Sequence, residues 1–304
     1  MTETAGHRAD SPAGSVTVVG TGAIGRAVAT TLLAAGRPVM VWNRTATRAR
    51  ELVDAGAVAA RSLQDAVTAS ALTLVTLKDY EAVDAVLAQL DGDLSGRSLA
   101  VLSTGTPADA RQAHERVEQL GADYLDAGVQ TSPEDVGTDV ATILYSGSRA
   151  AFERHRSTLQ LLSTPRFVSE DPQAAALWDL TLFGVWYDAQ LGLLRALETV
   201  QAAGIDLDEF AETAATQLGH VVHGAAATAA ELRDADFPRG PADLDEHLVV
   251  VQQLVEMRSA SRLGDGGLAH VCRVIESLVA DGRGGQGLTA VAEVHGEPSP
   301  PAPT

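Results

Sequence analysis

Cysteine is nearly absent from this sequence, which contains one, Cys272, among 304 residues. A single cysteine permits no internal disulfide, so we expect a protein of a reducing compartment and predict a cytoplasmic location. Cys272 stands in an apolar segment with helical periodicity, where such a residue is more often part of a core than a nucleophile.

Positive charge is also scarce. The 22 Lys and Arg residues stand against 40 Asp and Glu, which gives a formal net charge of −18. This excess of negative charge disfavours nucleic acid or an anionic membrane surface, so we expect neither as a partner. No signal-peptide pattern opens the chain, and no apolar run is both long and charge-free enough to cross a bilayer. An anionic ligand would therefore need local positive charge.

A glycine-rich turn follows the first predicted strand, residues 16–19. It has the spacing G-x-G-x-x-G and precedes a predicted helix over residues 23–35. The glycines allow a tight turn, a close approach of the backbone to a pyrophosphate, and close packing of the helix on the strand. The helix N-terminus offers free N–H groups to phosphates. We therefore predict a dinucleotide site that includes Gly20, Gly22, Ala23, Ile24 and Gly25.

The end of the second predicted strand, residues 39–42, indicates which dinucleotide is bound. An NAD site usually has an acidic residue there, which binds the ribose 2′-hydroxyl. This chain has Asn43, Arg44 and Thr45 instead, with Arg48 one turn further on. A guanidinium group without an acid suits a 2′-phosphate, so we predict NADPH as the cofactor, bound by these four residues. The alternative is that the arginines are solvated residues at a helix start.

Strand and helix signals alternate through the first half of the chain. Further strands are predicted over residues 72–77, 99–102, 124–127 and 142–145. This alternation predicts an α/β Rossmann domain with a doubly wound, mainly parallel sheet. Ligands bind beyond the C-terminal ends of the strands in such sheets. Leu77, Lys78, Ser103 and Thr104 are therefore predicted to bind the cofactor, with Gly128 nearby.

From residue 171 the strand signals disappear. Residues 172–203 are predicted to form one long helix, which is apolar on nearly all sides over residues 174–194 and is therefore expected to be buried all round. Helices are also predicted over residues 207–232, 243–263, 267–280 and 286–295. We predict a Rossmann domain at 15–170, an inter-domain helix at 171–203, a helical domain at 204–296, and disordered tails at 1–14 and 297–304.

Asp179 is the most informative polar residue of the long helix. Phe183 and Trp186 follow at i+4 and i+7 on the same face, with Tyr187 one position round. A carboxyl on an aromatic wall has a raised pKa unless a cation is bound beside it, and it can donate a proton or stabilise a cationic substrate. We predict Asp179 as catalytic and the three aromatic residues as substrate-pocket residues. The alternative is an acid that interacts with the helix dipole.

The remaining polar residues indicate no second kind of chemistry. The histidines lack the spacing of a metal-binding motif, so no metal site is predicted. Neither G-x-S-x-G nor a Cys–His arrangement is present to indicate nucleophilic catalysis.

Several stretches carry a family resemblance that covers residues 15–295. They are G-T-G-A-I-G-R-A, V-W-N-R-T, T-L-K-D-Y-E-A-V, L-S-T-G-T-P-A-D-A-R, Y-L-D-A-G-V-Q-T-S-P-E-D-V-G-T and I-L-Y-S-G-S-R-A-A-F. In these stretches the chain resembles the imine reductases, a branch of the β-hydroxyacid dehydrogenase superfamily. The resemblance implies a Rossmann domain, a long inter-domain helix and a helical C-terminal domain, exchanged between two chains in an intertwined homodimer. It also implies an NADPH-selecting role for Asn43, Arg44 and Thr45, and it places Gln130 in the substrate pocket.

The long helix distinguishes two branches of that superfamily. β-Hydroxyacid dehydrogenases carry a catalytic Lys followed by Asn there, whereas this chain has Asp179 in the corresponding region, as many imine reductases do. The resemblance implies NADPH-dependent reduction of C=N bonds in cyclic imines or iminium ions, with Asp179 as proton donor or iminium stabiliser. A β-hydroxyacid dehydrogenase and an NADP-binding protein without turnover are the alternatives.

Overall fold

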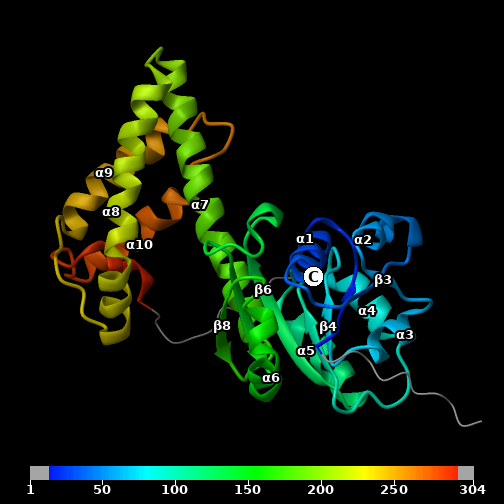
Figure 1. The fold of residues 1–304 in the computed structure, drawn as a ribbon. Helices are drawn as coiled ribbons and strands as arrows, with labels where there is room; N and C mark the ends of the chain where they lie inside the picture. The colour runs from blue at the N-terminus through cyan, green and yellow to red at the C-terminus, as the bar shows by residue number, and fades with distance from the viewer. Residues whose placement is uncertain (1–13, 294–304) are drawn as a thin grey trace, which may run out of the picture. The chain divides into compact units, whose positions relative to one another are not determined.

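The computed structural model describes residues 14–293, which form two compact units (Figure 1). One unit ends at Phe183 and the other begins at Gly184. Apart from Gly14, the two tails predicted to be disordered lie outside the described residues.

The first unit contains an eight-stranded sheet in the order β3-β2-β1-β4-β5-β6-β7-β8. All neighbouring strands are parallel except β6 and β7, so the predicted doubly wound, mainly parallel sheet is confirmed. Two strands were not predicted, because β3 is only two exposed residues long and β8 contains Pro165. The strands are β1 (Val16–Val19), β2 (Val39–Trp42), β3 (Val58–Ala59), β4 (Leu72–Val75), β5 (Ser98–Val101), β6 (Asp123–Gln130), β7 (Thr142–Gly147) and β8 (Thr164–Ser169).

Helices cover both faces of this sheet. One apolar core joins Val18 to Val28 and Phe152, and a second joins Val19 to Val83 and Val117. Adjacent residues of β1 thus point to opposite cores, as expected for a strand buried on both faces. The helices are α1 (Ala23–Ala34), α2 (Arg50–Asp54), α3 (Leu63–Thr68), α4 (Tyr80–Leu87), α5 (Pro107–Gln119) and α6 (Arg149–Leu159), with 3-10 turns at Ala46–Ala49 and Pro133–Asp135.

The rest of the described chain is helical, as predicted. Its elements are α7 (Ala174–Ala202), which begins in the first unit and continues into the second, α8 (Leu207–Asp234), α9 (Leu244–Met257), α10 (Leu268–Ala280) and a 3-10 turn at Leu288–Ala292. The α9 helix ends earlier than predicted. Just beyond it, the Ser261 hydroxyl accepts a bond from the Leu263 N–H at 3.2 Å, a local contact that competes with helical hydrogen bonding. The second unit has its own core around Leu244 and Ile275.

The expectation that α7 is buried all round is wrong for a single chain. Val185 and Trp186 are 65% and 58% exposed, and Leu177, Trp178 and Leu194 are exposed as well. Within residues 14–293, α7 presents more apolar surface than its own chain covers. Among the same residues, none of the helices combines the length and apolar character that crossing a membrane requires.

Candidate active site

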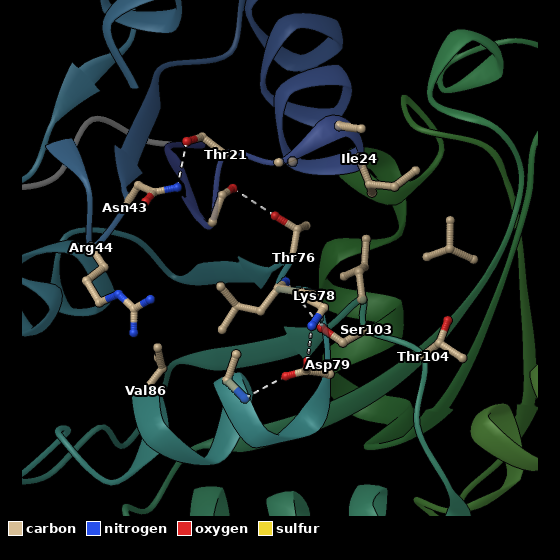
Figure 2. Close-up of a pocket in the computed structure, with 18 of the residues that line it drawn as sticks. Thr21, Ile24, Asn43, Arg44, Thr76, Lys78, Asp79, Val86, Ser103 and Thr104 are labelled. Carbon is tan, nitrogen blue, oxygen red and sulfur yellow. Dashed lines mark hydrogen bonds and ion pairs between the residues drawn. The ribbon is translucent and has the colours of Figure 1, made fainter. Parts of the chain in front are cut away.

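A pocket of about 860 Å³ lies beyond the C-terminal ends of β1, β4 and β5 (Figure 2). The segments that follow these strands form much of its wall, at residues 20–25, 76–79 and 102–104. Residues 42–44 and Arg48 contribute the side next to β2, and α4 contributes another. This is the edge at which doubly wound sheets bind ligands, because the polypeptide leaves neighbouring strands in opposite directions there.

The glycines of the loop after β1 are needed for two different reasons. A Cβ on Gly25 would lie 2.2 Å from the Gly20 carbonyl oxygen and 2.3 Å from Thr76 Oγ1, so α1 can pack this closely only with glycine. At Gly22 a Cβ would meet nothing within 4 Å, and this residue lines the pocket. Thr76 Oγ1 donates a hydrogen bond of 2.8 Å to the Gly20 carbonyl. The loop is therefore held from behind and open towards the pocket.

Asn43 fixes the turn at the end of β2. Its side-chain amide donates a hydrogen bond of 2.8 Å to Thr21 Oγ1, and its Oδ1 accepts one of 3.0 Å from the Thr45 N–H. In the described part of the chain, neither Arg44 nor Arg48 has an ion-pair partner for its side chain, and both line the pocket. Two guanidinium groups are thus available to an anion at this end.

The opposite end of the pocket is formed after β4 and β5, and Figure 2 shows Thr104 there, far from Arg44. Ser103 joins the two segments, since its hydroxyl donates to the Leu77 carbonyl at 3.0 Å and accepts from the Leu77 N–H at 3.2 Å. Lys78 lies 3.4 Å from Asp79, whose carboxylate also caps α4 through the Ala82 N–H. Val129, Thr131 and Phe183 complete this end.

Asp179 is buried next to the Thr104 end, with 2% of its surface exposed. Its Oδ1 accepts a hydrogen bond of 2.7 Å from Gln130 Nε2, and the Thr104 side chain donates a second. A Cβ on Gly128 would lie 2.9 Å from Asp179 Cβ, so only glycine on β6 allows α7 this close. Burial raises the pKa of the carboxyl above 3.8, and the bonds from Gln130 and Thr104 oppose this rise.

The structure brings most of the predicted cofactor residues together. The pocket wall contains twelve of them and one predicted substrate residue: Gly20, Gly22, Ala23, Ile24, Gly25, Asn43, Arg44, Arg48, Leu77, Lys78, Ser103, Thr104 and Phe183. Thr45 is outside it and bonds Asn43 instead. Gln130 and Gly128 contact Asp179 rather than line the pocket. Trp186 and Tyr187 belong to the second unit, where their rings meet edge to face at 5.0 Å.

Sequence reasoning missed one wall of the pocket. Ala82, Ala85 and Val86 line it from a single face of α4, and Gln89 lines it from just beyond the end of that helix. Their spacing matches one side of a helix, but the same apolar pattern is typical of a face that packs on the sheet. Only the position of α4 against the sheet distinguishes the two uses.

The residues present fit a phosphorylated dinucleotide. Gly22 leaves open space at the start of α1, where backbone N–H groups favour phosphate. Arg44 and Arg48 supply positive charge without a competing acidic partner among the described residues. Among residues 14–293, no group of three His, Cys, Asp or Glu side chains could hold a metal ion. The sheet, the glycine loop and this pocket define a dinucleotide-binding domain of the Rossmann type.

Two known families match successive parts of the chain. Residues 15–169 match the NAD binding domain of 6-phosphogluconate dehydrogenase, and residues 171–297 match the C-terminal domain described as NADPH-dependent reductive aminase-like. An NADPH-dependent reductive aminase of Aspergillus oryzae is 28% identical over 91% of this chain and 95% of its own length.

Solved structures show the same relationship. An imine reductase from a Pseudomonas species is 30% identical, with a TM-score of 0.83 over 91% of this chain and 98% of that chain. A reductive aminase from Aspergillus terreus in complex with NADPH and ethyl levulinate is 29% identical, also with a TM-score of 0.83 and the same coverage. The chain therefore belongs to the imine reductase family.

Proposed function

We propose that this protein reduces C=N bonds of cyclic imines or iminium ions with NADPH. The observation that carries the proposal is the buried Asp179 carboxyl, bonded to Thr104, which itself lines the dinucleotide pocket. Membership of the imine reductase family supports the same reaction. A dehydrogenase of 3-hydroxy acids is not favoured, because α7 lacks the Lys–Asn pair of that branch.

We assign the parts of NADPH to the two ends of the pocket. The glycine loop and the start of α1 hold the pyrophosphate, and Arg44 and Arg48 bind the 2′-phosphate, with Asn43 setting the turn that presents them. Leu77, Lys78 and Ser103 line the pocket together with Thr104. When bound, NADPH supplies the hydride that the imine carbon accepts.

Asp179 handles the proton of the reaction. Burial favours its neutral form, so a proton on the carboxyl is retained to a higher pH than on an exposed aspartate. Gln130 and Thr104 orient the carboxyl, and Asp179 then protonates the imine nitrogen or, when ionised, stabilises the iminium. Phe183 gives the neighbouring wall an apolar surface that suits an amine precursor, with Trp186 and Tyr187 as further proposed contacts.

We further propose that the protein is a cytoplasmic homodimer. The support is the apolar surface that one chain leaves exposed on α7, together with Val221 and Val222 on α8. A second copy offers matching apolar surface, which is how obligate dimers cover such faces. The division into a Rossmann domain at 15–170, an inter-domain helix at 171–203 and a helical domain at 204–296 is part of this proposal.

Substrate assays test the reaction. NADPH oxidation is measured with a 1-pyrroline-type imine, and NADP reduction is measured with a 3-hydroxy acid. Turnover of the imine alone is the expected result. Turnover of the hydroxy acid alone would assign the other branch, and cofactor binding without either turnover would identify a binding protein.

A further inference from the structure

A second buried carboxyl lies close to Asp179 but outside the residues that line the pocket. Asp126 on β6 is 2% exposed, and the hydroxyl groups of Tyr80 and Tyr124 both donate to its Oδ1, the second at 3.2 Å. The two tyrosine hydroxyls are also 3.2 Å from each other. None of the three side chains lines the pocket. Burying a carboxyl and two hydroxyl groups costs free energy, so these residues need an explanation other than the pocket wall.

The cluster of Asp126, Tyr80 and Tyr124 contacts the start of α7. The Ala176 N–H donates to the Asp126 carboxylate, and the Ala175 N–H donates to Ser146 Oγ at 2.9 Å. The first N–H groups of a helix have no partner within the helix, and a negative charge there is favourable. Side chains from β6 and β7 therefore fix the first turn of α7, and Asp179 follows three residues after Ala176.

The two hydrogen-bond partners of Asp179, Gln130 and Thr104, are connected to the same cluster through β6 and Tyr80. Tyr124, Asp126, Gly128 and Gln130 alternate along β6 and so share one face of the sheet. Gln130 bonds Asp179, and Gly128 touches it. A Cβ on Gly105 would lie 2.1 Å from the Tyr80 ring, so this ring packs directly on the residue that follows Thr104.

We propose that Asp126 is a positioning residue for Asp179. Held by Tyr80 and Tyr124, its carboxyl fixes the start of α7 on β6 and couples its own ionisation to that of Asp179. The inference rests on the proposed function, in which Asp179 handles the proton.

The electrostatics agree with this arrangement. Burial, with a smaller contribution from the charge of Asp179, raises the pKa of Asp126 to about 6, against the bonds from Tyr80, Tyr124 and Ala176. Two interacting carboxyls lose their protons in two steps that belong to the pair. The upper step lies above the pKa that either carboxyl would have beside a neutral neighbour. Among residues 14–293, the other ionisable groups that act on the cluster are on α5, where the His114 ring lies 5.6 Å from Tyr124 and the charge of Asp109 raises the pKa of Tyr80.

The test replaces Asp126 by asparagine in the full-length protein. Asp126→Asn keeps an acceptor for the Ala176 N–H but removes the charge, and Asp123→Asn is the matched control, since Asp123 is on the same strand and pairs with Arg154 at 2.8 Å. Carboxyl carbons of aspartate-labelled protein are titrated by NMR without substrate. The imine-reduction kcat, the NADPH affinity and the Tm are measured on the same preparations, with kcat followed over pH.

We expect Asp126→Asn to remove the titration step near pH 6 and to let Asp179 titrate at a lower pH than in the parent, because the neighbouring negative charge is gone. The kcat should fall about tenfold at pH 7, and its basic limb should move to lower pH by the same shift, because a displaced donor transfers its proton poorly. NADPH affinity should stay within about twofold, since the cluster does not line the pocket. Asp123→Asn should change none of these.

Two further variants keep the test decisive if Asp126→Asn does not fold. Tyr80→Phe and Tyr124→Phe each remove one donor that favours the charged carboxylate, so the upper titration step should move to higher pH. An Asp179 titration and a kcat profile that are the same in all these variants as in the parent would overturn the proposal. If Asp179→Asn keeps full kcat for imine reduction, the proposed role of Asp179 in proton transfer fails instead, while the NMR titration still reports whether the two carboxyls are coupled.

Discussion

Gln130 Nε2 donates a hydrogen bond of 2.7 Å to Asp179 Oδ1 and so joins β6 to α7 across 49 positions of the sequence. This bond and the contact at Gly128 define where the proposed proton donor lies. The site therefore depends on the packing of one strand against one helix as much as on the chemistry of its residues.

Asp179 is the first residue to test. Asp179→Ala should lower kcat for imine reduction by roughly 10²-fold or more, the range expected for loss of a general acid. NADPH affinity should barely change, because the phosphates bind at the glycine loop. Asp179→Asn should also be poor, since it keeps the size but loses the proton and the charge. A variant that melts well below the parent would indicate a packing role, so kcat, cofactor affinity and Tm are measured together.

Gly128→Ala should move Asp179 without removing it. The new methyl group would lie 2.9 Å from Asp179 Cβ and 3.1 Å from the Ala175 carbonyl oxygen. Overpacking of this kind costs about 1 to 3 kcal/mol, so the free energy of unfolding and kcat should both fall. Gly285→Ala is the control, because a Cβ there meets nothing within 4 Å. An unchanged kcat in Gly128→Ala would show that the helix position is not critical.

Arg44→Ala tests cofactor choice. The substitution should weaken NADPH binding by roughly tenfold to a hundredfold and leave NADH binding nearly unchanged, because a charge-assisted contact to the 2′-phosphate is lost. Arg61→Ala is the matched control, since Arg61 is exposed and pairs with Asp65 outside the pocket. Titration of both cofactors into both variants gives the comparison. Equal losses for NADPH and NADH would refute the assignment.

His155 predicts how stability depends on pH. Burial lowers the pKa of its imidazole from 6.5, the charge of Arg154 acts in the same direction, and Nε2 lies 2.9 Å from Ser98 Oγ. The unfolded chain therefore binds this proton more readily than the folded one. The contribution of His155 is complete above about pH 6.5 and is lost as the pH falls towards the folded-state pKa.

The measurement compares the parent with His155→Gln in thermal unfolding between pH 8 and pH 5. The Tm of the parent should fall more steeply on acidification. Asp126 has the opposite effect on stability over part of this range. Its carboxyl binds a proton more tightly in the folded state, so its contribution to the free energy of unfolding increases as the pH falls below about 6. Both proteins contain Asp126, so the difference between them reports the histidine. His220→Gln, at an exposed position, should follow the parent.

The proposed dimer predicts a specific effect of charge on α8. Val222 is 72% exposed in the single chain, and Val140 in the first unit is 74% exposed. Val222→Asp should weaken the dimer, because a charge would be buried in an apolar interface, whereas Val140→Asp should leave it intact. Sedimentation at micromolar concentration measures both. A stable, folded monomer of the parent protein would contradict the dimer.

The nucleotide-binding half of the site could be predicted from the amino-acid sequence because its signals are local. Gly20, Gly22 and Gly25 lie close together where a strand passes into a helix, and Arg44 is the second residue after the next strand. Backbone conformation and strand order place such residues at one edge of the sheet, whatever the remaining side chains do.

Tertiary structure alone decided the surroundings of Asp179. Its contacts with Gln130, Gly128 and Thr104 join segments far apart in the chain, and no periodicity along α7 indicates them. The same holds for the buried Asp126 between two tyrosines, and for the face of α4 that lines the pocket. Local patterns report which face of an element is apolar, but the register between a strand and a helix that pack together is set by side-chain contacts across the whole core.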